Sequence, residues 1–229
     1  KTGAGTLRMT AITNALTDQS WTNKSAGSTS LPIVPWLTGG TNNGDPGSTF
    51  LTYQTNFGFR PLDETTEFVN QTFAAAGNLD AGTASNNHLR IAFTANNSDA
   101  TLAEDMAVLG LLLDNSGGSG SDVQLGANTL TVQSGLILST GSQYIEIQGT
   151  AGITFGPNES TGFEGRIHGV QRLYLYAPII DNVIGGATNA VSMTFDGNVY
   201  LYGDSTYSGN TYVNSGLLYI GNNNRLPTN

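Results

Sequence analysis

Apolar and polar residues alternate through the second half of the chain, from about residue 123 onward. Apolar residues stand two positions apart in a series of short segments, which is the period of a strand with one buried face. The segments are Leu130–Val132, Ile145–Ile147, Ile153–Phe155, Leu173–Leu175, Met193–Phe195, Val199–Leu201 and Leu218–Ile220. Glycines between them supply the positive-φ corners of tight turns. The pattern predicts short strands joined by sharp turns.

The spacing of these segments indicates winding. Ile153, Leu173 and Met193 recur at intervals of 20 residues, and Val213 falls on the next step. A parallel β-solenoid has coils of roughly this length, each stacked on the last at a strand spacing of about 4.8 Å. We therefore expect a parallel β-solenoid with a coil of about 20 residues.

The first half of the chain is less regular. Residues 14–50 contain Trp21, Trp36, the segment LPIVPW and the loop TGGTNNGDPGS, which predict a rigid excursion from the solenoid. The run from Ser48 to Val69 predicts a strand, a turn at Phe57-Gly58 and a return segment, and HLRIAFTA (88–95) predicts another strand. We thus expect an irregular N-terminal β region over 1–122, continuous with regular solenoid coils over 123–229.

Residues 101–113 leave two interpretations open at their start. Thr101 and Glu104 have the form of a capping box, which is compatible with a helical turn over 101–107. Irregular structure over the same residues is an equally good interpretation. The following VLGLLL (108–113) favours a strand, because Gly110 interrupts helical propensity and Asp114-Asn115-Ser116-Gly117 is an abrupt turn.

The last part of the chain, Ser205 to Asn229, combines β-branched and aromatic strands with Ser-Gly and Gly-Asn turns. It resembles the repeat unit of the autotransporter-associated β-strand family. The matching positions are Tyr207, Gly209, Thr211, Val213, Gly216 and Leu218. KTGAGTL (1–7) is similar to the opening phrase of the same repeat. The resemblance implies a right-handed parallel β-helix, an extracellular place and adhesive or structural duty, and both ends suggest a piece cut from a longer repetitive chain.

Composition narrows the classes of partner. The net charge is −9, and the eight Lys and Arg residues are not clustered, which argues against nucleic acid. The chain has no cysteine, as is common in secreted bacterial surface proteins, so disulfides and thiolate metal sites are excluded. The longest apolar patch, Val108–Leu113, is too short to cross a bilayer.

Tyrosines form the most conspicuous candidate surface. In LYLYA and VYLYG the alternation places leucine and valine in the core and tyrosine outside. The tyrosines of this half are Tyr174, Tyr176, Tyr200, Tyr202, Tyr207, Tyr212 and Tyr219. We predict an outward aromatic ladder that contacts a ligand or partner at Tyr174, Tyr176, Tyr200, Tyr202 and Tyr212. Such a ladder binds sugar rings or a neighbouring subunit, or it simply stiffens the sheet.

Three other motifs are weaker candidates for a metal-binding or catalytic site. GGSGSD (117–122) matches half of a calcium-binding repeat, but a single copy favours a flexible Gly/Ser turn, so Ca²⁺ is only a minor alternative to having no cofactor. Asp63, Glu64 and Glu67 lie in one segment and favour a solvated loop. Arg166 and His168, two residues apart, would suit a lyase but are more typical of a surface strand. We predict no catalytic, cofactor-binding or metal-binding residue.

The sequence therefore favours a non-enzymatic structural or adhesive β-solenoid segment of a larger bacterial surface protein, which self-associates into a fibre or coat or contacts neighbouring surface proteins. The alternative is a carbohydrate-binding or carbohydrate-active β-helix with a polysaccharide partner. A trimeric fibre such as a phage tail is a third hypothesis.

Overall fold

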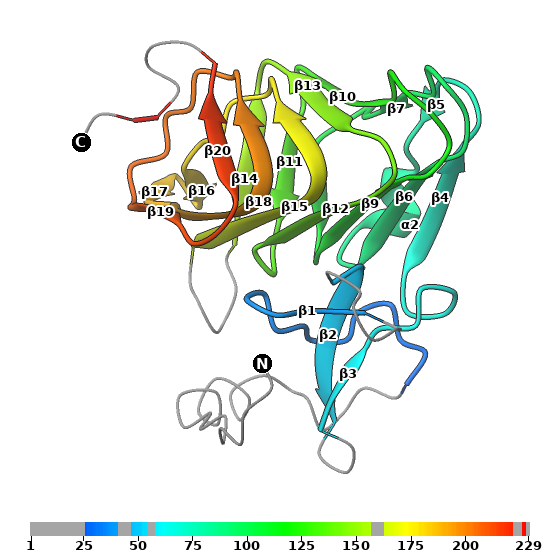
Figure 1. Ribbon diagram of the computed structural model, residues 1–229. Coiled ribbons are helices and arrows are strands. Elements are labelled where there is room, and N and C mark those ends of the chain that lie inside the picture. The colour runs from blue at the N-terminus through cyan, green and yellow to red at the C-terminus, as the bar shows by residue number, and fades with distance from the viewer. Residues whose placement is uncertain (1–25, 41–46, 55–57, 157–162, 222–225, 228–229) are drawn as a thin grey trace.

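Parallel strands stacked coil upon coil make up most of the protein (Figure 1). The computed structural model describes residues 26–40, 47–54, 58–156, 163–221 and 226–227. The stack is a parallel β-solenoid, as expected, and a small antiparallel sheet lies against it. KTGAGTL, Trp21 and the tip of the turn at Phe57 lie outside the described residues.

The strands of the solenoid form three faces. Face A contains β4 (Val69–Phe73), β6 (Leu89–Phe93), β9 (Leu111–Asn115), β12 (Leu136–Gly141), the first parts of β15 (Glu164–Leu175) and β18 (Ser192–Leu201), and β19 (Thr211–Val213). Face B contains β5 (Gly77–Asn78), β7 (Ala100–Thr101), β10 (Asp122–Gly126), β13 (Ile145–Gly149), the second parts of β15 and β18, and β20 (Leu217–Ile220). Face C contains β8 (Met106–Val108), β11 (Thr129–Val132) and β14 (Gly152–Phe155).

Two long strands bend from face A to face B. In β15 and β18 the register shifts between the two parts, and Gly169 is paired with Gly197 at the bend. Gly197 has φ +72°, and a Cβ there would lie 2.1 Å from the carbonyl oxygen of Gly169. Only glycine fits at Gly197, because the backbone conformation and the close approach of the preceding coil both exclude a side chain.

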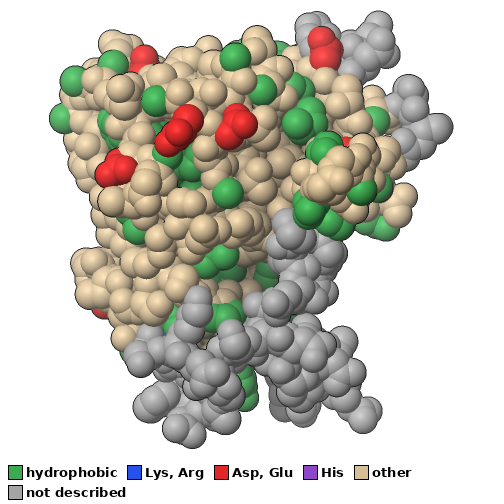
Figure 2. All heavy atoms as spheres, turned by 180° about the vertical axis from the view of Figure 1, so that it is seen from behind, with side chains coloured by type: hydrophobic (Ala, Val, Ile, Leu, Met, Phe, Trp, Pro, Cys, Tyr) green, Lys and Arg blue, Asp and Glu red, His purple; other side chains and the backbone are tan. Residues whose placement is uncertain are grey.

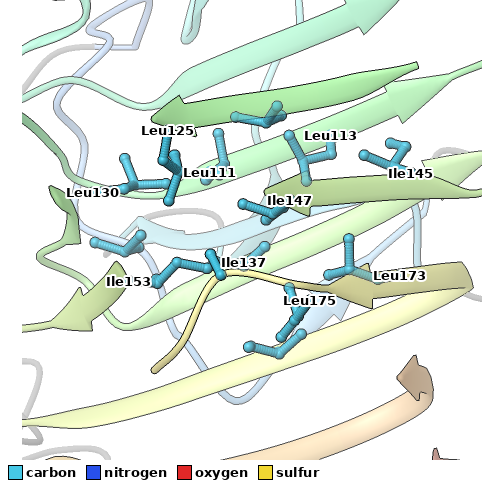
Figure 3. Packing of buried hydrophobic residues seen from close by; sticks show 14 of the residues in the cluster. Leu111, Leu113, Leu125, Leu130, Ile137, Ile145, Ile147, Ile153, Leu173 and Leu175 are labelled. Atoms are coloured by element: carbon cyan, nitrogen blue, oxygen red, sulfur yellow. The ribbon is translucent and has the colours of Figure 1, made fainter. Parts of the chain in front are cut away.

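The core follows the predicted alternation. Inward side chains from the three faces meet inside the coils, as Leu111, Ile137, Ile147 and Ile153 do in Figure 3. Every segment predicted as a strand from residue 123 onward lies in one, and HLRIAFTA contains β6. The predicted strand and return segment of the N-terminal half are β2 (Thr49–Gln54) and β3 (Gly58–Pro61).

The predicted 20-residue period is wrong. Ile153 on face C is opposite Leu130 and Ile179, whereas Leu173 on face B is opposite Ile145 and Val199. Paired residues on face A are separated by as few as 18 positions, from Phe195 to Val213, and by as many as 30, from Ile137 to Ile167. The coils differ in length because their corners hold different insertions.

One insertion is the hairpin of β16 (Asn182–Ile184) and β17 (Ala187–Asn189), whose two turn glycines both have positive φ. The predicted alternative of a helical turn over 101–107 is also wrong, because Thr101 ends β7 and Met106 begins β8. The structure instead has a short helix, α2 (Ala81–Ala84), whose N-cap Asp80 accepts a hydrogen bond from the Thr83 N–H.

The coils begin at Val69, earlier than the expected boundary at residue 123. The described residues between 26 and 68 form what we call the N-terminal module, with β1 (Thr38–Gly39), β2 and β3 in one antiparallel sheet. Its apolar side chains pack on the outside of face A. The shared cluster is Leu31, Ile33, Phe50, Leu62, Phe68, Leu112, Leu136 and Leu138. This contact explains the uninterrupted apolar runs in β9 and β12, whose strands are buried on both sides.

Candidate functional site

Two rows of outward side chains run along face B, one residue from each coil. In the first row Asp122 is paired with Glu146, Glu146 with Tyr174, and Tyr174 with Tyr200, which is paired with Tyr219. The second row begins with Thr101, Gln124 and Gln148, which are paired in turn. Tyr176 and Tyr202 continue it, since each follows a paired core leucine. Each row therefore changes from carboxylate or amide to tyrosine between β13 and β15.

The tyrosines stack on one another. The ring centroids of Tyr174 and Tyr200 are 4.6 Å apart and those of Tyr176 and Tyr202 are 4.8 Å apart, with nearly parallel planes in both pairs. Tyr219 contacts both Tyr200 and Tyr202, and Tyr144 contacts the edge of Tyr174. The spacing matches the distance between neighbouring strands, so the rings form a continuous ladder. We call these six residues the tyrosine ladder.

Four of the five predicted contact residues lie in this ladder, namely Tyr174, Tyr176, Tyr200 and Tyr202. Tyr212 is also exposed, but it lies on β19 of face A and has no ring contact with a described aromatic residue. Tyr207, which was not among the predicted contact residues, is fully buried in the core, and its hydroxyl hydrogen-bonds Thr211. It lies in a corner, where strand alternation does not apply.

Carboxylates and amides form the other half of face B. The Gln148 Nε2 group donates to Asp122 Oδ2 and to Glu146 Oε2, both at 2.9 Å, and Gln124 Nε2 donates to Asp122 Oδ2 at 3.1 Å. Burial, together with the charges of Glu146 and Asp99, raises the pKa of Asp122 to about 6. Sequence inspection missed this group, although the alternation in IEI and DVQLG already placed Glu146 and Gln124 outside.

A depression of about 350 Å³ lies where the two halves meet. It is lined by Gln124, Gly126, Gln148, Gly149, Thr150 and Tyr176. Gly126 and Gly149 are paired in register, so two consecutive coils lack a side chain at the same place. A Cβ at Gly126 would meet no atom within 4 Å, so the absence of a side chain there leaves open space.

Arg166 and His168 lie on face A, as a strand with outward polar side chains predicts. Arg166 forms an ion pair with Asp196, which is buried and also accepts a hydrogen bond from the Asn214 amide at 2.8 Å. Burial, assisted by the charge of Arg166, lowers the pKa of His168, and Asp196 opposes the shift. The guanidinium of Arg166 is thus engaged by a carboxylate.

The three acidic residues of LDETTEF have separate structural roles. Glu67 is buried and accepts hydrogen bonds from Arg60 and from the N–H groups of Gly27 and Asp63, so the hypothesis of a solvated loop is wrong for it. Asp63 accepts from the N–H and the hydroxyl of Thr65. Glu64 lies 3.5 Å from the Arg90 guanidinium.

The GGSGSD turn packs closely on the coil before it. A Cβ at Gly117 would lie 2.0 Å from the backbone of Thr94, and the Ser119 N–H donates to Asn96 Oδ1 at 2.9 Å. The turn is therefore a corner fitted to its neighbour. Within the part of the chain that the structure describes, no group of three or more His, Cys, Asp or Glu side chains could hold a metal ion.

The described surface carries a strong excess of negative charge. Figure 2 shows acidic side chains and no Lys or Arg on the described surface of the face seen from behind. On face B, the strands β5, β7, β10, β13 and β20 contain no basic residue, and β15 contributes Arg172 at the bend from face A. A surface of this sign attracts cations and repels acidic polymers.

Comparisons with protein-family models, curated proteins and solved structures gave no significant match to this chain. Among the described residues, the structure has no helix with the length and apolar character that a membrane span requires.

Proposed function

We propose that this protein is a non-enzymatic structural or adhesive solenoid of the bacterial cell surface or extracellular space, and that copies assemble through the last coil of the stack. The observation that supports the proposal is that, in the part of the chain that the structure describes, the strands of this coil pair on one edge only. Within the described residues, β19 and β20 each pair only with β18, so a further strand, of this chain or of a second copy, can pair with their other edges. Unpaired strand edges are templates for pairing with another chain.

The side chains of the last coil support the same conclusion. Val213 and Ile220 are 54% and 40% exposed, although the residues paired with them in the previous coil, Phe195 and Leu201, are buried. An end coil that finishes a solenoid normally presents polar groups to water. An apolar, unpaired end coil fits the stacking of a further coil better than contact with solvent.

The opposite end of the stack also has strands paired on one edge only, since β4 pairs only with β6 and β5 only with β7 among the described residues, but its side chains differ. Gln71 occupies a position of β4 whose paired residue in the next coil is the buried Ile91. Its side chain accepts a hydrogen bond from the Asp80 N–H at 2.9 Å and donates to the Asp80 carbonyl at 3.0 Å. This polar bridge closes the first coil. The two ends therefore differ, and assembly through the last coil is the mode that the described contacts favour.

Sedimentation velocity over a range of protein concentrations, with negative-stain microscopy of the same samples, tests the proposal. We expect the wild-type chain to form concentration-dependent assemblies, and the double variant Val213→Asp/Ile220→Asp to remain monomeric. The matched control is Val183→Asp, which changes a valine that is 64% exposed on the hairpin β16–β17 and should leave assembly intact. A monomeric wild type at every concentration, or a double variant that assembles normally, contradicts the proposal.

The rival, a carbohydrate-active β-helix, draws less support from the described groups. Its best candidate pair was Arg166 and His168, but the Arg166–Asp196 ion pair occupies the cation that a lyase would direct at its substrate. Incubation with plant, algal and bacterial polysaccharides, monitored by ultraviolet absorbance for unsaturated products, should show no turnover. Turnover that is lost in Arg166→Ala would establish the rival.

A further inference from the structure

We propose that the depression beside Tyr176 binds a saccharide ring that carries hydroxyl and amine donors, with the Tyr176 ring as the stacking surface. This site lies on face B, away from the unpaired edges of the last coil, and it extends the proposed structural function by giving the surface a glycan ligand. Four observations support it: Tyr176 is the end ring of the aromatic stack, a hollow lies beside it, the lining groups are mainly hydrogen-bond acceptors, and the neighbouring carboxylates are negatively charged.

Tyr176 ends its row of the tyrosine ladder. Tyr202 covers one face of its ring, at a centroid distance of 4.8 Å and an interplanar angle of 15°. On the other side the row continues with Gln148, and the Tyr176 side chain lines the depression there and is 42% exposed. Rings in the middle of a stack cover one another, whereas the end ring is available to a ligand. A saccharide ring in the hollow would pack against the Tyr176 ring beside Gln148.

The two paired glycines at the hollow have different roles. A Cβ at Gly149 would lie 2.6 Å from the Cβ of Leu125, so the position excludes any larger residue. Gly126 would accommodate a Cβ without any contact within 4 Å, so only the absence of a side chain leaves that part of the hollow empty. The volume of about 350 Å³ is at the lower end of ligand sites, which run from about 300 to 1,000 Å³.

The polar groups around the hollow are mainly hydrogen-bond acceptors. Gln148 Nε2 donates both of its hydrogens, to Asp122 and Glu146, and Gln124 Nε2 donates one to Asp122, so both carbonyl oxygens and one Gln124 N–H remain for a ligand. Thr150 donates its hydroxyl hydrogen to the Gly126 carbonyl at 3.1 Å and keeps lone pairs on its oxygen. A ligand must therefore bring donors, which sugar hydroxyl and ammonium groups supply.

Charge complementarity selects among sugars. Asp122 and Glu146 lie in the neighbouring row, hydrogen-bonded to the two glutamines, and the charges that act on Asp122 are those of Glu146 and Asp99. This local negative potential favours an amino sugar and disfavours a uronic acid. An ammonium group near the free face of Tyr176 would also gain a cation–π interaction.

The test measures binding by calorimetry in the Val213→Asp/Ile220→Asp background, so that failure of assembly and failure of glycan binding are distinguishable. The probes are oligomers of glucosamine, of N-acetylglucosamine and of galacturonic acid. We expect the glucosamine oligomer to bind most tightly, the N-acetylated oligomer more weakly and the galacturonate oligomer not at all. Tyr176→Ala should weaken binding about tenfold, the upper range for loss of an aromatic contact. The matched control Tyr212→Ala removes an exposed tyrosine of face A and should change nothing.

Several outcomes overturn the proposal. Absence of glucosamine oligomer binding contradicts it directly. Equal binding of the galacturonate oligomer contradicts the charge argument, and equal effects of Tyr176→Ala and Tyr212→Ala contradict the placement. A lysine-rich peptide that binds more tightly than every saccharide would assign the surface to a basic polypeptide instead.

Discussion

Glu67 illustrates how one buried carboxylate organises a module. Burial by itself would raise its pKa, but hydrogen bonds from Arg60, the Gly27 N–H and the Asp63 N–H outweigh burial, so the pKa lies below its usual range. All three donors belong to the N-terminal module. The carboxylate thus joins segments that are far apart in sequence, which no local pattern in LDETTEF could indicate.

Glu67→Gln should therefore destabilise the N-terminal module strongly. The change leaves the Arg60 guanidinium partly buried without its counter-charge, and breaking a buried ion pair costs about 3 to 5 kcal/mol. Urea unfolding followed by the fluorescence of Trp36 measures the loss. Glu64→Gln is the control, since Glu64 is more exposed, and it should change the free energy of unfolding by about 0.5 kcal/mol or less. Equal effects of the two variants would contradict this role of Glu67.

Asp122 should make stability depend on pH in the opposite sense to an ordinary surface aspartate. Its pKa of about 6 lies above the value of about 3.9 in an unfolded chain, so the folded state binds more protons between these values. Ionisation of Asp122 therefore destabilises the fold at neutral pH. This contribution disappears as the pH falls through about 6 towards 4.

Asp122→Asn keeps an oxygen acceptor for the two glutamines and removes the charge. The variant should be more stable than the wild type at pH 7.5, by about 1 kcal/mol after allowance for solvent screening, and the difference should vanish near pH 4. Thermal unfolding at both pH values measures it. A variant that is less stable at pH 7.5 would show that the hydrogen bonds to the carboxylate outweigh the repulsion from Glu146 and Asp99.

At the residue scale, alternation along the strands was sufficient to place Tyr174, Tyr176, Tyr200 and Tyr202 on the outside. It could not give their stacking, because stacking depends on which coils are neighbours. Nor could it place Tyr207, which follows a strand and turns inward at a corner.

Among the elements, β9 and β12 carry leucine or isoleucine side chains on both of their sides, one side in the solenoid core and the other under the N-terminal module. Leu112 and Leu138 point away from the solenoid core into the cluster shared with the N-terminal module. Leu138→Ala should cost about 2 to 5 kcal/mol, as buried leucine truncations do, and should increase hydrogen exchange in β2 and β3 before the coils are affected. Ile184→Ala, on the exposed tip of the hairpin, is the control and should be nearly neutral. Uniform loss of protection in all strands would contradict an independent module contact.

The elements themselves were well predicted, since period-two alternation reports a buried strand face directly. The period of the coil was not. The predicted period assumed that Ile153 and Leu173 occupy the same position in successive coils. They belong to different faces, so the 20-residue interval between them is accidental. The corners between faces hold loops, a hairpin and a bend within a single strand, and their lengths leave no regular signal in the sequence.

For the whole molecule, the solenoid class followed from strand and turn patterning, whereas three features depended on contacts between distant segments. These are the docking of the N-terminal module on face A, the polar closure of the first coil by Gln71, and the change from carboxylates to tyrosines along face B. The last of these follows from register, because Glu146 and Tyr174 are 28 positions apart in sequence and adjacent in the sheet.

The central claim is that the last coil is a surface for strand addition. Hydrogen exchange of the amides in β19 and β20, measured over a range of protein concentrations, tests it most directly. We predict that protection in Thr211–Val213 and Leu217–Ile220 rises with concentration, while the amides of β9 and β12 stay equally protected throughout. Exchange in β19 and β20 that is independent of concentration, in a sample that nevertheless assembles, would show that copies meet elsewhere and would contradict the claim.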